Sequence, residues 1–170
     1  MKKIILTLFF VATTSLVLGQ RVMEGESQIN AGFGFTSDWG VPFYGGFDYG
    51  VHEDITVGLQ VSYASETYNA GSYGDYKGTW FGVGANGNYH FNTVLDIPDN
   101  FDVYAGVTLA YDSFSYKYPN GFIGSNTSSG MGFAGQIGAR YYFSDKLGVN
   151  LEFGGGNITS GGKIGISYKL

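Results

Sequence analysis

Ile55-Thr56-Val57-Gly58-Leu59-Gln60-Val61-Ser62-Tyr63 is the stretch that decides the fold of this chain. Its odd positions are apolar or aromatic, and its even positions are polar or glycine. Because successive side chains of a β-strand point to opposite faces, this alternation predicts a strand with one apolar and one polar surface. The stretch from Phe101 to Asp112 repeats the pattern.

The same two-residue period covers most of the chain after Gln20, where no segment sustains a helical period. Clusters of Gly, Asn, Asp, Ser and Pro separate the alternating runs, as expected for turns. The sequence therefore predicts an all-β protein, a membrane-spanning up-and-down antiparallel β-barrel of eight strands. The predicted strands lie near residues 28–36, 41–51, 54–66, 79–91, 101–117, 130–143, 148–156 and 162–170.

Residue size distinguishes the inside of this barrel from its outside. The polar faces combine many glycines with a few large side chains, which suits the narrow interior of a small closed barrel. The apolar faces carry no charged residue, as contact with lipid requires, because a cation near mid-bilayer costs ~2–4 kcal/mol there. The polar set is Asn30, Asp48, Gln60, Asn86, Asn88, Asp102, Thr108, Gln136, Arg140, Asn150, Glu152, Ser167 and Lys169, and the apolar set is Phe33, Phe35, Phe43, Phe47, Val83, Val107, Leu109, Ile137, Leu151, Phe153, Ile164 and Ile166.

A soluble lipocalin-like carrier with an apolar cavity is the alternative to a membrane barrel. Such a carrier would present Lys and Glu to water rather than Gly and Asn. Aromatic residues near the segment ends favour the membrane, because they are typical of the girdles at the lipid headgroups, although β-propensity also explains some of them. They are Tyr49, Tyr63, Tyr89, Phe91, Tyr111, Tyr141, Phe143 and Tyr168.

The N-terminus predicts export. Lys2 and Lys3 precede an apolar run to Leu18, which is typical of a secretory signal peptide over residues 1–19, followed by a barrel domain over 20–170. An uncleaved anchor is disfavoured because the run is shorter than the ~20 residues of a spanning helix.

Composition excludes several classes of protein. Charged residues make up 14 % of the chain, against ~25 % in ordinary globular domains, and the net charge is −5. This balance argues against nucleic acid as a partner, since phosphate binding needs clustered cations. Without cysteine the chain has no disulfide, thiolate metal site or cysteine nucleophile.

With its signal peptide, its period-two segments and the terminal strand Lys163-Ile164-Gly165-Ile166-Ser167-Tyr168-Lys169-Leu170, the chain resembles the OmpA transmembrane-domain and OmpX-like families. The resemblance implies a bacterial outer-membrane location and partners in outer-membrane lipid, periplasmic chaperones and the barrel-assembly machinery. It also implies an assembly signal at the C-terminus. In those families the last residue is usually Phe or Trp, whereas this chain has Tyr168 and Leu170 as candidates.

The polar face supplies a candidate lumen network of Asp48, Asp102, Arg140, Glu152 and Lys169. Buried charges persist only when they are paired, so we expect a plug of ion pairs in a lumen that side chains fill. Arg140 and Glu152, on adjacent strands, are the expected pair. The same residues could instead line a path for ions or small solutes.

Other motifs give weaker signals. Gly82 to Gly87 matches the dinucleotide pattern G-x-G-x-x-G, but a strand continues after it where that pattern needs a helix, so we expect no cofactor. His90 and His52 raise the possibility of a lipid-modifying enzyme, yet His90 is predicted at the periplasmic end and its surroundings lack that family's motif. No cluster of His or Cys indicates a metal.

The segments 69–78 and 119–129 are rich in Tyr, Gly, Asn and Ser and are predicted to be external loops, suited either to surface contact or to plain solvation. We therefore expect a structural or surface-interaction barrel without catalysis. A small-solute porin-like conduit is the first alternative, and a lipid-modifying enzyme or soluble carrier the next.

Overall fold

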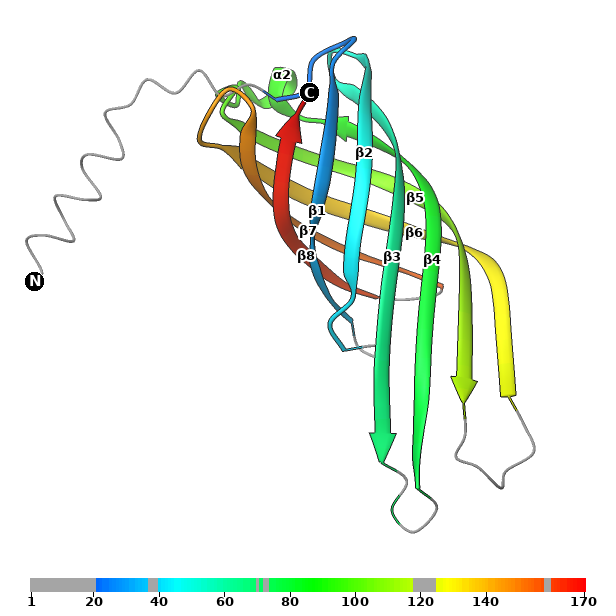
Figure 1. The fold of residues 1–170 in the computed structure, drawn as a ribbon. Coiled ribbons are helices and arrows are strands. Elements are labelled where there is room, and N and C mark those ends of the chain that lie inside the picture. Colours follow the sequence, from blue (N-terminus) through cyan, green and yellow to red (C-terminus); the bar gives the residue numbers. More distant parts are fainter. Residues whose placement is uncertain (1–20, 37–39, 70, 72–73, 118–124, 158–159) are drawn as a thin grey trace, which may run out of the picture.

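The computed structural model is a closed antiparallel barrel, in which each strand pairs with its neighbours in sequence and β8 closes on β1 (Figure 1). It describes residues 21–36, 40–69, 71, 74–117, 125–157 and 160–170, with the backbone alone for 125 and 126. The strands are β1 (Ser27–Thr36), β2 (Phe43–His52), β3 (Ile55–Asn69), β4 (Asp75–His90), β5 (Phe101–Lys117), β6 (Ser125–Tyr142), β7 (Leu147–Gly156) and β8 (Ser160–Lys169). The predicted all-β barrel of eight strands is confirmed.

The two ends of the barrel differ. One, here called the closed end, carries residues 21–26, the turn between β2 and β3, the turn between β6 and β7, and the one-turn helix α2 (Asn92–Leu95). The segment 92–100 was predicted as a plain turn; α2 forms there and stops at Asp96, whose backbone is left-handed at φ 51°. No helix of the described residues is long and apolar enough to cross a membrane. The predicted signal peptide, residues 1–19, lies outside the described residues.

At the opposite, open end, one wall of the barrel extends further than the other (Figure 1). This overhang comprises residues 64–69 of β3, 75–80 of β4, 113–117 of β5 and 125–129 of β6. The expectation of external loops at 69–78 and 119–129 is wrong for residues 69, 75–78 and 125–129, which continue strands; residues 70, 72, 73 and 119–124 lie outside the described part. Tyr, Thr and Ser along the overhang suit strands, and Tyr68 stacks on Tyr76 at 5.1 Å between ring centroids.

Polarity in the barrel is inverted relative to a water-soluble protein. Leu59 and Phe133 point outward and are 61 % and 66 % exposed, whereas Asp102 and Arg140 point inward and are 0 % and 4 % exposed. The glycine-rich polar faces of the strands therefore line the lumen, and the apolar faces form the outer surface.

The outer surface carries an apolar band that ends sharply. On β3 it runs from Ile55 to Tyr63, roughly 27 Å at ~3.4 Å per residue, and the next outward residues are Ser65 and Thr67. The band is comparable with the ~25 Å of membrane barrels once strand tilt is included. Exposed aromatics border it: Tyr49, Tyr89, Phe101, Tyr141, Phe143 and Tyr168 toward the closed end, and Phe33, Phe43, Tyr63, Phe81, Tyr111 and Phe133 toward the open end.

A glycine of β6 makes room for one of the large lumen side chains. A Cβ atom on Gly138 would overlap the ring of Tyr104, which lies across from it on β5. Gly135, on the outer face of the same strand, has nothing within 4 Å of such a Cβ atom. The lumen glycine is thus required by packing, and the outer one is not.

Candidate functional site

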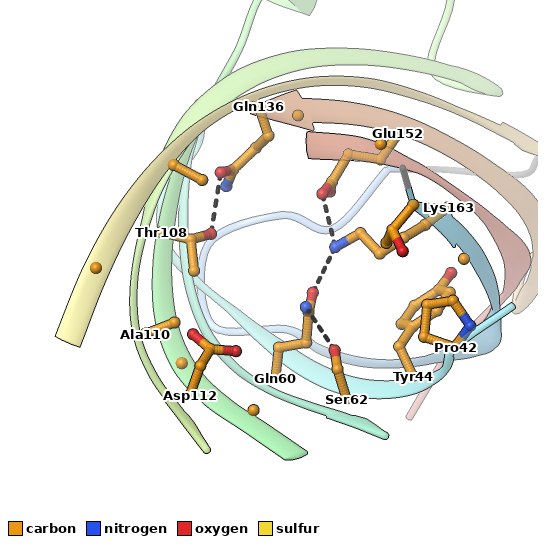
Figure 2. Close-up of a pocket in the computed structure, with 18 of the residues that line it drawn as sticks. Pro42, Tyr44, Gln60, Ser62, Thr108, Ala110, Asp112, Gln136, Glu152 and Lys163 are labelled. Atoms are coloured by element: carbon orange, nitrogen blue, oxygen red, sulfur yellow. Dashed lines mark hydrogen bonds and ion pairs between the residues drawn. The ribbon is translucent and has the colours of Figure 1, made fainter. Parts of the chain in front are cut away.

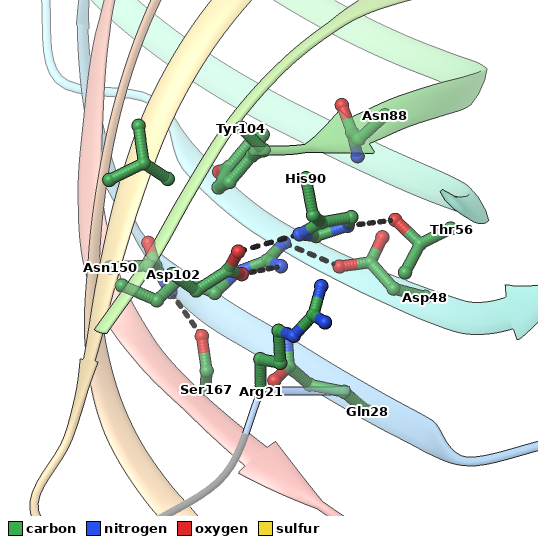
Figure 3. Close-up of polar contacts among 12 residues, drawn as sticks. Arg21, Gln28, Asp48, Thr56, Asn88, His90, Asp102, Tyr104, Asn150 and Ser167 are labelled. Carbon is green, nitrogen blue, oxygen red and sulfur yellow. Dashed lines mark hydrogen bonds and ion pairs between the residues drawn. The ribbon is translucent and has the colours of Figure 1, made fainter. Parts of the chain in front are cut away.

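In the closed-end half of the lumen, Asp48, Asp102 and Tyr104 (Figure 3) gather around Arg140. The guanidinium donates through one nitrogen to Asp48 on β2, at 2.7 Å, and through the other to Asp102 on β5, at 3.0 Å. It also lies over the ring of Tyr104, 4.4 Å from the centroid. Asp102 faces Arg140 on the neighbouring strand, whereas β2 lies on the far side of the barrel, so the contact between Arg140 and Asp48 crosses the lumen.

His90 extends the same cluster to β3. Its Nδ1 lies 2.6 Å from Asp102, and its Nε2 lies 2.9 Å from the hydroxyl of Thr56. Because the Asp102 carboxylate already accepts from Arg140, the His90 Nδ1 must donate to it. The hydroxyl–imidazole–carboxylate order is the one that hydrolases use. Here His90 is 1 % exposed and Thr56 is fully buried, so no substrate reaches the hydroxyl in this conformation.

Residues just before β1 complete the closed end. Arg21 is 3 % exposed and donates to Asp54 at 2.8 Å and to Thr93 at 3.2 Å. Burial raises the pKa of the Asp54 carboxyl, but the hydrogen bonds from Thr93 and Arg21 outweigh it and hold the pKa below its usual range. These contacts tie the segment before β1 to the turn between β2 and β3 and to α2.

Glu26 makes a further closing contact, an ion pair with Lys169 of β8 at 2.8 Å. Desolvation raises the pKa of Glu26, and the hydrogen bond and the charge of Lys169 lower it to below its usual range overall. Lys169 also donates to the backbone oxygen of Arg21. We refer to the contacts around Arg140, Arg21 and Lys169 together as the plug.

A second layer crosses the middle of the lumen (Figure 2). Lys163 of β8 contacts Glu152 of β7 at 2.6 Å and donates to the side-chain oxygen of Gln60 on β3 at 2.5 Å. The hydroxyl of Tyr104 donates to the other oxygen of Glu152 at 2.9 Å. This layer is therefore joined to the plug through Tyr104, which also lies against Arg140.

Between this layer and the open end lies a cavity of about 130 Å³, here called the cup (Figure 2). Its wall includes Gly82, Gly132 and Gly154, inward positions without side chains to fill it. Trp80 and Asp112 belong to the same wall, and the indole Nε1 of Trp80 donates to Asp112 at 2.5 Å. A cavity of this size has room for a small molecule or several waters.

The five predicted network residues all point inward, but they form three groups rather than one. Arg140 joins Asp48 and Asp102 in the first. The expected pairing of Arg140 with Glu152 is wrong: Glu152 pairs with Lys163, and Lys169 pairs with Glu26. The expectation did not include the register: Asn150 and not Glu152 faces Arg140 on β7, Asp102 faces it on β5, and the long side chain also reaches Asp48 across the lumen.

Several residues that build the site were not singled out from the sequence. Tyr104, Lys163 and Trp80 share the inward parity of their strands, so extending the alternation along β4, β5 and β8 would have found them. Arg21 gave no signal because it precedes β1. The predicted assembly-signal residues are at the end of β8: Tyr168 faces outward, and the Leu170 backbone N–H donates to Ser27. Their role stays a prediction.

The dinucleotide-like motif lies within a strand. Gly82 to Gly87 runs within β4, so no helix N-terminus is available there for a dinucleotide phosphate. Among the described residues no group of three or more His, Cys, Asp or Glu could hold a metal ion.

Comparison with known proteins rests on structure. No protein-family model matches the chain, and the curated proteins contain no match to its sequence. Its structure is similar to the outer membrane protein OprG of Pseudomonas aeruginosa, with a TM-score of 0.73 and 15 % identity over 91 % of this chain and 99 % of that chain.

Two further solved structures are similar over nearly their whole length. The N-terminal β-barrel domain of Pseudomonas aeruginosa OprF has a TM-score of 0.60 and 14 % identity, covering 86 % of this chain and 98 % of that chain. The attachment invasion locus protein Ail of Yersinia pestis has a TM-score of 0.59 and 16 % identity, covering 87 % of this chain and 100 % of that chain. With its closed barrel, its inverted polarity and these neighbours, the chain has the fold of the small eight-stranded bacterial outer-membrane barrels.

Proposed function

We propose that this protein is exported, inserts in a bacterial outer membrane with its closed end toward the periplasm, and acts there as a non-conducting barrel with a structural or surface-interaction role. The apolar band and its aromatic borders support the membrane location, since in water the exposed band would aggregate. Export would remove residues 1–19, and chaperones and the assembly machinery would be the transient partners.

The plug is the observation that carries the non-conducting role. A solute crossing the lumen would have to separate the contacts that span it, Arg140 with Asp48 in the plug and Lys163 with Gln60 in the second layer. Removing one partner of a buried ion pair costs about 3–5 kcal/mol, because it leaves an uncompensated charge. Two such layers in series favour a closed lumen over the alternative of a small-solute conduit.

Planar-bilayer recording tests this proposal. The purified protein should give no steady single-channel currents, whereas a variant with Arg140→Ala, Tyr104→Ala and Lys163→Ala should conduct, because both layers lose their crossing side chains. Asp145→Asn, at an exposed turn of the closed end, is the matched control and should stay silent. Steady currents from the wild-type protein would favour the conduit instead.

The overhang supports the surface-interaction half of the proposal. It extends beyond the apolar band, its outward side chains include Thr67, Lys77 and Lys117, and it lies opposite the closed end. In the proposed orientation it would therefore project outside the cell. A structural neighbour, Ail, is named for attachment and invasion, which is in keeping with such a role.

Trimming the overhang separates the two roles. Deleting residues 68–76 removes the register-matched pairs Tyr68–Tyr76 and Asn69–Asp75 of β3 and β4 and leaves the apolar band intact. If the role is structural, cells with the trimmed protein should resist detergent as well as wild-type cells do, while cells lacking the protein should not. If the role is surface interaction, cells with the trimmed protein should adhere as poorly as cells lacking the protein. The trimmed protein should still fractionate with the outer membrane.

A further inference from the structure

The cup contains a buried carboxylate that lacks a cation. Among the described residues, Asp48, Asp54 and Asp102 are buried and each contacts an arginine. Asp112 is 4 % exposed, makes none of the ion pairs of the described residues, and accepts its hydrogen bond from the indole of Trp80. Taking a carboxylate out of water without a counter-charge is costly, so this position favours a cation from outside the chain.

The cationic residue of the cup does not pair with Asp112. Lys163 is the cationic residue of the described cup wall, and its ammonium group is held by Glu152 and Gln60; Figure 2 shows Lys163 and Glu152 across the cup from Asp112. Counting Lys163, Glu152 and Asp112, the cup wall has a net charge of −1. Its potential therefore attracts cations and repels anions.

The aromatic surroundings of Asp112 indicate which kind of cation fits. Trp80 lines the cup, and Phe114 stacks on it with ring centroids 6.5 Å apart and planes 10° apart. Aromatic faces attract ammonium groups, and the attraction is strongest for tryptophan and for cations that give up their water easily. A metal ion needs several oxygen ligands, usually with more than one carboxylate, and among the described residues no group of three or more His, Cys, Asp or Glu is placed to supply them.

Glycine keeps the space beside Asp112 free. Gly82 pairs with Asp112 across β4 and β5, and a Cβ atom on it would come within 2.6 Å of the Asp112 carboxylate. The other glycines of the wall leave the cavity of about 130 Å³ that a ligand would occupy.

We propose that Asp112 and Trp80 form a site in the cup for a small organic cation, an ammonium group that carries apolar carbon. The carboxylate neutralises the charge, and the indole contacts the carbon groups. The site requires the cup alone, so it does not depend on whether the plug conducts or on the membrane in which the barrel lies.

Tryptophan emission provides the test. The chain has two tryptophans, so Trp39→Phe leaves Trp80 as the reporter. The protein in detergent micelles is titrated with choline chloride at constant ionic strength, and separately with 3,3-dimethylbutan-1-ol, the neutral isostere of choline. We expect a saturable change in Trp80 emission with choline and none with the alcohol. No saturable change, or equal changes with both, would overturn the proposal.

Variants locate the site. Asp112→Asn keeps an acceptor for the indole and should weaken choline binding at least about tenfold, whereas Asp145→Asn, which removes the same charge from an exposed turn, should leave it unchanged. Unchanged affinity in Asp112→Asn refutes the assignment.

A second variant covers the case in which Asp112→Asn does not refold. Lys163→Gln releases Glu152 and makes the cup more negative, so choline should bind more tightly; equal or weaker binding counts against the proposal. A saturable emission change with calcium chloride in the absence of choline would identify a metal site instead, and would also refute it.

Discussion

Replacing Arg140 by methionine removes the cation that joins two buried carboxylates across the lumen. In the wild type its nitrogens lie 2.7 Å from Asp48 and 3.0 Å from Asp102, and all three side chains are at most 4 % exposed. Methionine retains much of the apolar stem without the charge. Two carboxylates then remain in a space that water does not readily enter.

The size of the effect follows from this geometry. Loss of one partner of a buried pair costs about 3–5 kcal/mol. Asp102 keeps the hydrogen bond from His90 at 2.6 Å, and Asp48 keeps one from Asn30 at 2.9 Å, so the remaining contacts limit the loss. We expect Arg140→Met to lower the free energy of unfolding by about 3 kcal/mol, toward the lower end of that range.

Urea titration of the protein in lipid vesicles, followed by tryptophan emission and by heat-modifiable gel mobility, measures this change. The key comparison is a triple variant that adds Asp48→Asn and Asp102→Asn to Arg140→Met. Because the orphaned charges are gone, it should regain most of the lost stability. If Arg140→Met costs less than about 1 kcal/mol, or if the triple variant is less stable than the single one, the plug does not work as described.

Three other perturbations test the plug, the closed end and the band, each through the free energy of unfolding. Gly138→Ala should cost about 1–3 kcal/mol because its methyl group overlaps the tyrosine ring across from it, whereas Gly135→Ala on the outer face should cost less than about 0.5 kcal/mol. Asp54→Asn should destabilise the protein at pH 7, and because the folded-state pKa of Asp54 is lowered, the difference from wild type should shrink below about pH 4, as the carboxylate protonates. A difference that instead grows on acidification contradicts this. Leu59→Arg, in the middle of the band, should cost about 2–4 kcal/mol in lipid vesicles, while Ser65→Arg, just beyond the band on the same strand, should cost little; equal losses would show that the band does not contact lipid.

The two-residue period predicted most of the architecture because it is a local property of the chain. Successive side chains of a strand such as β3 point to opposite faces whatever the partner strand is. Inward and outward residues could therefore be assigned from odd and even positions. Strand ends were less certain. β4 and β6 continue into residues that were predicted as loops. Their extra length depends on pairing with the long strands β3 and β5, not on composition.

Contacts across the lumen lie beyond what local pattern can predict. Parity placed Arg140 and Glu152 on the inner face, but the register of neighbouring strands sets Asp102 opposite Arg140 and Lys163 opposite Glu152, and only the closed barrel brings Asp48 of β2 within reach of Arg140. The register of β4 and β5 likewise set the indole of Trp80 beside Asp112. Alternation along one strand thus determined which side chains face inward, and closure of the sheet determined which of them meet, because pairing across the lumen depends on residues far apart in the chain.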